Sequence, residues 1–217
     1  MPAARRSRYV FIALEAGCAL LAVGLGWLLG VDLWKRVDWS PKVLALGTFG
    51  AVPILLVAAG VARSNWTPIR RLMRLVDELI VPFFGGWSVW EMALVSAAAG
   101  VGEELLFRGV LQSFVEERLG VVAAITIASV VFGLAHYLTT AYAALALMIG
   151  VYLGWLYLVT GNLAVPMVAH GVYDFLALVW LTRFGKAPRV VSDLRGEMEP
   201  ANEKGVPTPF GESGRHS

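Results

Sequence analysis

The chain has 217 residues, of which 58% are hydrophobic and only 16% are charged. Charged residues make up about 25% of ordinary soluble domains. The deficit here falls in long apolar blocks, so the composition excludes a soluble globular protein and favours an integral membrane protein. The formal net charge is +2, and the basic residues lie in short patches with no nucleic-acid-binding pattern. The single cysteine, Cys18, excludes an intramolecular disulfide framework.

Six apolar stretches are candidates for transmembrane helices, each of which needs about 20 residues. The first lacks a cleavage site and is longer than the apolar core of a signal peptide, so we interpret it as a retained helix. The sequence therefore predicts an all-α fold, a polytopic membrane helix bundle. The six stretches cover residues 9–30, 43–62, 88–115, 121–138, 141–160 and 164–182.

Basic residues predict the orientation of the bundle. They gather in the N-terminal tail, in the connection after the second span and after the sixth span. Because such residues favour the cytoplasmic side, we expect both termini to be cytoplasmic, in the plasma membrane of a bacterium. Residues 184–217 are rich in proline, glycine and charge, which predicts a disordered cytoplasmic tail.

The connection between the second and third spans predicts an amphipathic helix. Thr67-Pro68 is a helix-start signal. Apolar residues then recur at helical spacing over residues 69–80, and three arginines take the opposite face. We expect this helix to lie in the membrane interface. Pro82 and Gly85-Gly86 are expected to end the helix, with Trp87 and Trp90 at the headgroup boundary.

Charged side chains interrupt the third span, in Gly102-Glu103-Glu104-Leu105-Leu106-Phe107-Arg108-Gly109. Each costs about 3 kcal/mol or more inside a bilayer, so it must face protein or a wet cavity. Glu104 and Arg108 are four residues apart on one helical face and are expected to form an ion pair. Glu103 is turned about 100° away and has no such partner, so we expect it to be the catalytic carboxylate. Glu15, in the first span, has no evident partner, and we interpret it as snorkelling towards the interface.

Two histidines lie in later spans, each in an i,i+4 pair. Phe132 precedes His136 in the fourth span, and Asp174 follows His170 in the sixth. If the third and fourth spans form a hairpin that turns at Leu119-Gly120, Glu103 and His136 are nearly equidistant from the turn and lie opposite each other. His170 joins them if the sixth helix begins at Pro166 and residues 162–165 are extended. A carboxylate beside an imidazole can hold and deprotonate a water, and a hydrogen-bond donor can stabilise an oxyanion. The set therefore indicates hydrolysis.

Three motifs, in this order and in membrane spans, resemble those of the CPBP intramembrane proteases. This family includes the type II CAAX prenyl endopeptidases and bacteriocin-processing or self-immunity proteins. The resemblance covers roughly residues 88–182. The motifs are Glu-Glu-x-x-x-Arg, Phe-x-x-x-His and His-x-x-x-Asp, made here by Glu103, Glu104, Arg108, Phe132, His136, His170 and Asp174.

The resemblance implies roles for these residues. Glu103, assisted by His136, activates a water, while His170 and Asp174 stabilise the oxyanion. Many members of the family have asparagine at the last position. Since a carboxyl group donates a hydrogen bond only when it is protonated, Asp174 is alternatively a residue that orients His170. Glu103, His136 and His170 are also the set that would hold a zinc ion. We favour a mechanism without a metal and expect no cofactor.

The sequence thus predicts an intramembrane endopeptidase that cleaves near the cytoplasmic face. Residues 1–87 would form two spans and the interfacial helix, and residues 88–183 the catalytic core. The expected partners are a peptide or membrane-associated protein substrate and the lipid bilayer, with no nucleic acid. Two alternatives stay open: a non-catalytic scaffold or bacteriocin-immunity protein of the same fold, and a small transporter that uses the ionisable cluster as a proton relay.

Overall fold

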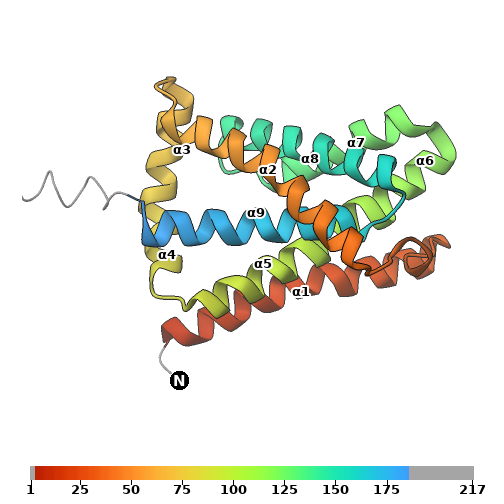
Figure 1. Cartoon of the computed structure of the whole chain (residues 1–217), viewed down its shortest axis with the longest axis horizontal. Helices are drawn as coiled ribbons and strands as arrows, with labels where there is room; N and C mark the ends of the chain where they lie inside the picture. The colour runs from red at the N-terminus through yellow and green to blue at the C-terminus, as the bar shows by residue number, and fades with distance from the viewer. Residues whose placement is uncertain (1–2, 186–217) are drawn as a thin grey trace, which may run out of the picture. The chain divides into compact units, whose positions relative to one another are not determined.

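A computed structural model describes residues 3–185, and these residues form helices and turns with no strand among them. Figure 1 labels the longer helices in chain order. The helices are α1 (Ala3–Leu29), η1 (Trp34–Arg36), α2 (Pro41–Arg63), α3 (Thr67–Leu75), η2 (Val76–Ile80), α4 (Val81–Gly85), α5 (Val89–Glu104), η3 (Leu105–Gln112), α6 (Ser113–Leu119), α7 (Val121–Ala135), α8 (Thr140–Thr160) and α9 (Ala164–Arg183).

Each of the six predicted spans is helical, which confirms a helical membrane bundle. Four helices are long and apolar enough to cross a membrane alone: α1 from Arg8, α2, α8 and α9. The run from Val89 to Leu119 passes the same test only together with Thr67–Gly85, from which it is bent by 116°. Helix α7 has 15 residues and is shorter than a full span. By length and composition, the described residues therefore contain four or five spans, where the sequence predicted six.

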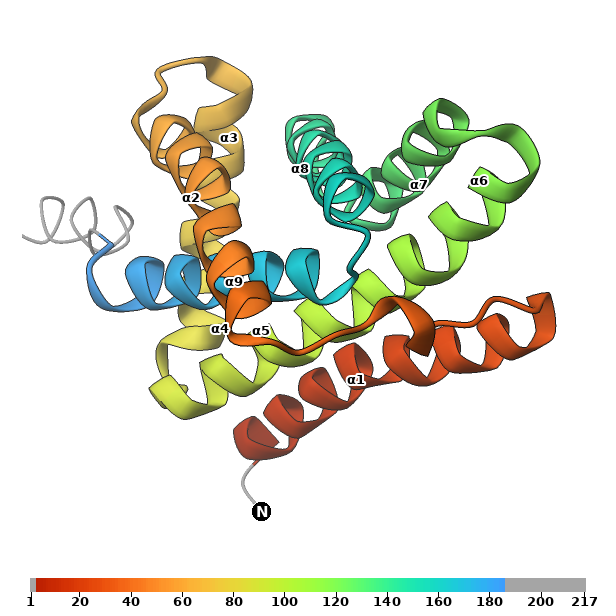
Figure 2. The same ribbon diagram turned by 45° about the vertical axis from the view of Figure 1, so that its right-hand side comes forward.

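Close packing of small residues fixes how the helices cross. Helix α1 lies along α5, and α9 packs between α5 and α2, while α7 and α8 form a neighbouring pair (Figures 1 and 2). A Cβ atom at Gly100 of α5 would lie 2.7 Å from the Gly171 nitrogen and 2.7 Å from the Met167 oxygen of α9. Only a residue without a side chain allows two backbones to approach so closely.

The turn between α6 and α7 is the one that the sequence predicted. Gly120 links the two helices with φ +82°, a conformation in which glycine pays no steric penalty. Helices α6 and α7 pack against each other on either side of it. As a result, the end of α7 runs back towards the middle of the α5–η3 run, where the glutamates lie.

The predicted amphipathic helix ends at Gly85, where Gly85-Gly86 was expected to end it. The chain stays helical across Pro82, so only the part of the prediction that relied on the proline was wrong. The π-helical turn η2 directly precedes Pro82, and its wider hydrogen-bonding pattern accommodates a residue that lacks an N–H donor. Ile69 and Leu72 are buried against the bundle.

Trp87 also departs from expectation. It is 2% exposed, within a cluster of Phe84, Met92 and Val95, and so packs inside the protein and not against lipid headgroups. The Trp87 side chain instead packs against aromatic and apolar residues between the end of α4 and the start of α5. The predicted disordered tail, from residue 186 onward, lies outside the described residues.

The α5–α9 crossing generates the first prediction. Gly100→Ala should lower the free energy of unfolding by about 1–3 kcal/mol, because the new methyl group meets backbone atoms of α9 that have no room to move. The measurement is the unfolding midpoint of the purified protein in detergent. Gly17→Ala is the matched control, since its Cβ has nothing within 4 Å and should leave the midpoint unchanged or slightly raised. Equal midpoints for the two variants would contradict the assigned packing.

Candidate active site

Glu104 is the centre of a buried ionic network. Its Oε1 accepts hydrogen bonds from Nη1 of Arg108 at 2.8 Å and from Nδ1 of His170 at 2.9 Å. The side chains of Glu104 and Arg108 are 0% and 1% exposed. The i,i+4 ion pair that the sequence predicted is therefore present, and the imidazole of His170 on α9 shares the same carboxylate oxygen. Charge-assisted hydrogen bonds of this kind offset the cost of burying the charges.

Arg108 belongs to the π-helical segment η3, and it reaches across to α8. Its Nη2 donates to the Gly150 oxygen at 3.0 Å, and Nε2 of Gln112, one turn on, donates to the Gly154 oxygen at 3.1 Å. A Cβ at Gly154 would lie 2.7 Å from Oε1 of Gln112, so the glycine leaves space for this contact. Wide π-helical turns often occur at functional sites. Here the segment follows the paired glutamates directly and joins the α5 run to α8.

Glu103 faces His136, as predicted. Nε2 of His136 lies 3.5 Å from Oε2 of Glu103, and the two side chains are 23% and 12% exposed. His136 is the first residue after α7, and its Nδ1 contacts the Phe132 oxygen at 2.8 Å. A carbonyl oxygen only accepts, so Nδ1 carries the proton and Nε2 is the nitrogen turned to Glu103.

Oε2 of Glu103 has no hydrogen-bond donor among the described residues, although it is buried. With the proton of neutral His136 on Nδ1, both Nε2 and the carboxylate oxygen are acceptors. Two acceptors that face each other are bridged well by one water that donates a hydrogen bond to each. This arrangement can hold a water and take a proton from it.

His170 and Asp174 form the other polar pair. Nε2 of His170 lies 3.4 Å from Oδ2 of Asp174, and the Asp174 side chain is 29% exposed. His170 is thus held between two carboxyl groups, Glu104 at Nδ1 and Asp174 at Nε2. The route to this position was predicted wrongly. Helix α9 begins at Ala164, whose N–H donates to Oδ1 of Asn162, so residues 164 and 165 are helical and not extended.

Phe132 lies among the charged and polar groups as an apolar wall. The centre of its ring is 4.3 Å from that of His136 and 6.1 Å from that of His170. The Arg108 guanidinium lies 4.5 Å from the same ring centre, within cation–π range. Phe107 packs edge-on against it at 5.0 Å. All three predicted motifs therefore meet around one ring.

One acidic residue near the site was not predicted to be there. The carboxyl groups of Glu15 and Glu103 lie within hydrogen-bonding reach of each other. Helices α1 and α5 come close at Gly102, where a Cβ would lie 2.5 Å from the backbone oxygen of Glu15 and 3.2 Å from Cβ of Cys18. The interpretation of Glu15 as a snorkelling side chain is therefore wrong. A lone carboxylate in an apolar run was the available signal, but its partner is 88 positions away and no local spacing identifies it.

The residues fit a metal ion poorly. Nδ1 of His170 faces Glu104 and Nε2 faces Asp174, while Nδ1 of His136 is bonded to a backbone oxygen. Nδ1 of His170 is therefore committed to Glu104, and only Nε2, 3.4 Å from Asp174, could act as a ligand. Among the described residues, no three His, Cys, Asp or Glu side chains form a group with metal-binding geometry.

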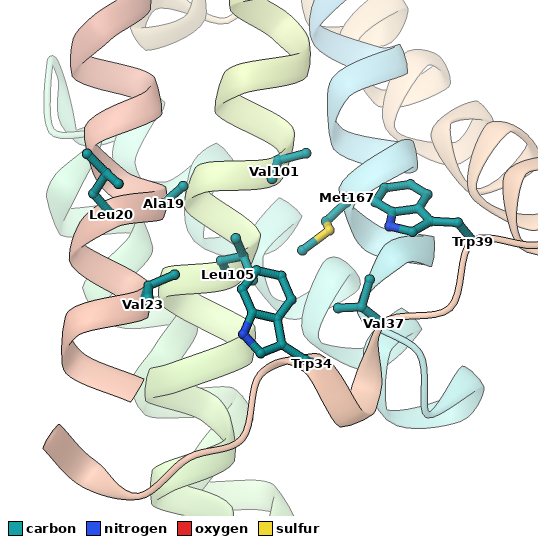
Figure 3. A pocket seen from close by; sticks show the side chains of 9 residues that line it. All are labelled: Ala19, Leu20, Val23, Trp34, Val37, Trp39, Val101, Leu105 and Met167. Carbon is teal, nitrogen blue, oxygen red and sulfur yellow. The ribbon is translucent and has the colours of Figure 1, made fainter. Parts of the chain in front are cut away.

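An apolar cavity of about 330 Å³ lies between α1, α5, α9 and the segment around η1 (Figure 3), and none of the candidate catalytic residues lines it. Leu105 directly follows Glu104, and Met167 lies one turn before His170. The volume is in the range of small ligand pockets. Its lining is Ala19, Leu20, Val23, Trp34, Val37, Trp39, Val101, Leu105 and Met167.

Comparisons with known proteins agree with the motifs. Residues 85–176, which include every predicted site residue, match the family model described as type II CAAX prenyl endopeptidase Rce1-like. The uncharacterized protein YpbD of Bacillus subtilis (strain 168) is 28% identical over 142 residues, which are 63% of this chain and 69% of that protein. No solved structure gives a significant match. The predicted resemblance is confirmed over residues 85–176, where the chain is similar to the Rce1-like type II CAAX prenyl endopeptidases.

Proposed function

We propose that this protein is an intramembrane endopeptidase in which Glu103 and His136 activate the water that cleaves a peptide bond. The observation that carries the proposal is the 3.5 Å approach of His136 Nε2 to Oε2 of Glu103, a buried carboxylate oxygen that otherwise lacks a donor. The similarity to this family supports a protease. The adjacent Glu104 is 0% exposed and its Oε1 accepts from Arg108 and His170, so Glu103, which faces His136, is the better placed base.

The reaction follows from these positions. Glu103 takes one proton from the water while His136 holds it, and the water oxygen attacks the carbonyl carbon of the scissile bond. The carbonyl oxygen becomes an oxyanion. When the tetrahedral intermediate collapses, the C–N bond breaks and Glu103 returns the proton to the leaving nitrogen. The products are a carboxylic acid and an amine, and Glu103 is again ionised.

His170 is the proposed donor to the oxyanion. Its contact with Asp174 is 3.4 Å, longer than a well-formed hydrogen bond, so a proton on Nε2 is free to turn to a stronger acceptor. Glu104 fixes the ring through Nδ1. Asp174 then orients His170, which is the alternative to its acting as a donor itself. Preorganised donors of this kind contribute about 2.7–4 kcal/mol to acyl transfer.

The proposed substrate is a peptide or membrane-associated protein. We place both termini of the protein in the cytoplasm of a bacterium, on the side favoured by the arginines after α2 and α9, with cleavage near that face.

The first prediction here concerns the base and its partner. Glu103→Gln and His136→Ala should each lower hydrolysis of a membrane-delivered peptide by at least about 100-fold, because each removes one of the two groups that activate the water. Glu117→Gln, at an exposed position, is the control and should retain full activity. Terminal proteomics of cells that carry each variant identifies the products.

Other outcomes would point to other functions. A phenotype that survives in both variants indicates a scaffold or immunity protein that acts by binding. A pH-dependent flux without new peptide termini indicates a transporter. Either result would overturn the proposed protease.

A second prediction separates structure from chemistry. Arg108→Met should destabilise the protein by about 3–5 kcal/mol, because it leaves a fully buried carboxylate without its guanidinium. Glu103→Gln should keep the unfolding midpoint within the error of the measurement. If Arg108→Met keeps the wild-type midpoint yet loses activity, Arg108 takes part in the chemistry and the division proposed here is wrong.

A third prediction concerns metals. Since no three His, Cys, Asp or Glu side chains among the described residues are grouped as metal ligands, dialysis against a strong chelator should leave hydrolysis unchanged. The measurement is the rate before and after dialysis, with the metal content of the protein determined in parallel. Loss of activity that zinc restores would contradict the metal-free mechanism.

A further inference from the structure

Helix α1 lies outside the part of the chain that matches the family, yet it reaches the candidate active site. The family match begins at residue 85, whereas α1 ends at Leu29. Helices α1 and α5 run side by side (Figure 2). Gly102, the residue before Glu103, is the point of closest approach, since a Cβ there would meet backbone atoms of Glu15 and Ala19 at 2.5 and 3.2 Å.

The orientation of Glu15 follows from this crossing. Leu14 and Leu20 are 64% and 77% exposed on the outer side of α1, while Glu15 is partly buried and turned to α5. A carboxyl group in a membrane span is costly and is retained where it has a partner. The partner here is the carboxyl group of Glu103, within hydrogen-bonding reach.

Glu103 is thus contacted on two sides. His136 approaches it from the end of α7 at 3.5 Å, and Glu15 approaches from α1. A carboxylate with a single long contact can rotate about its side-chain torsions, and a base that rotates loses its alignment with the water. A second hydrogen bond restricts this rotation. Reacting groups that are held in alignment react much faster than groups that rotate freely.

We propose that Glu15 is a positioning residue that hydrogen-bonds the Glu103 carboxyl group and holds it against His136. The inference rests on the proposed function and deepens it, because it makes α1 part of the catalytic unit. A hydrogen bond between two carboxyl groups requires one proton, which lies between them. The site is therefore incomplete in residues 85–176 alone.

The test uses the full chain in detergent with a membrane-delivered peptide substrate. Glu15→Ala should lower kcat by about 10- to 100-fold and leave KM within about 2-fold, because it removes the alignment of the base and no substrate contact. Glu15→Gln should restore most of kcat, since its amide group donates to the Glu103 carboxylate in place of the shared proton. A merely structural role would not produce this rescue. Leu14→Ala, on the lipid-facing side, is the control and should keep wild-type kcat.

The outcomes distinguish this inference from the proposed function. If Glu103→Gln is inactive while Glu15→Ala keeps wild-type kcat, the role of Glu15 is overturned and the protease stands. If Glu103→Gln keeps its activity, both fail.

A double-mutant cycle gives a readout that needs no activity. The changes in the free energy of unfolding caused by Glu15→Ala, Glu103→Ala and the double variant should be non-additive if the two carboxyl groups interact. Additive changes would overturn the pairing, whatever the activity.

Discussion

The buried contact of one carboxylate with a guanidinium and an imidazole is the constraint on which the site depends. Oε1 of Glu104 joins the end of α5 to η3 through Arg108 and to α9 through His170, and Arg108 continues to the backbone of α8. Each charge is too costly to bury alone, so the three elements must arrive in one arrangement. The Phe132 ring then lies within 4.5 Å of the Arg108 guanidinium and packs near both imidazoles, those of His136 and His170.

The two adjacent glutamates differ by one position in the helix, and this difference gives Glu104 a structural role and Glu103 the role of the proposed base. A helix turns each successive side chain by about 100°. This rotation sends Glu104 into a dry interior where Oε1 accepts two charge-assisted hydrogen bonds. Glu103 instead faces His136 at the longer distance of 3.5 Å, with an oxygen that lacks a donor. The buried ion pair with Arg108 makes Glu104 a poor base, whereas Glu103 faces the imidazole of His136.

Local spacing explains what could be predicted from the sequence. The Glu104–Arg108 pair follows from four-residue spacing, and the meeting of Glu103 with His136 follows from the turn at Gly120. His170 was placed near them for the wrong reason. It reaches Glu104 because α5 and α9 cross closely at Gly100, not because the chain before Pro166 is extended. The contact of Glu15 was missed for a related reason, since helix crossings depend on packing over the whole bundle and no local pattern encodes them.

The helices that least resemble membrane spans carry most of the site, and the bilayer explains why. Glu103, Glu104 and Arg108 lie in the α5–η3 run, which is not among the helices that could cross a membrane alone. His136 follows α7, which with 15 residues is too short to cross a membrane. A bilayer tolerates such segments where other helices separate them from lipid. Helices α1, α2 and α8 supply long apolar surfaces around them. The apolar helices thus provide the surface that faces lipid. The interior can then hold charged side chains, a π-helical segment and the end of α7, where the His136 imidazole faces the Glu103 carboxylate.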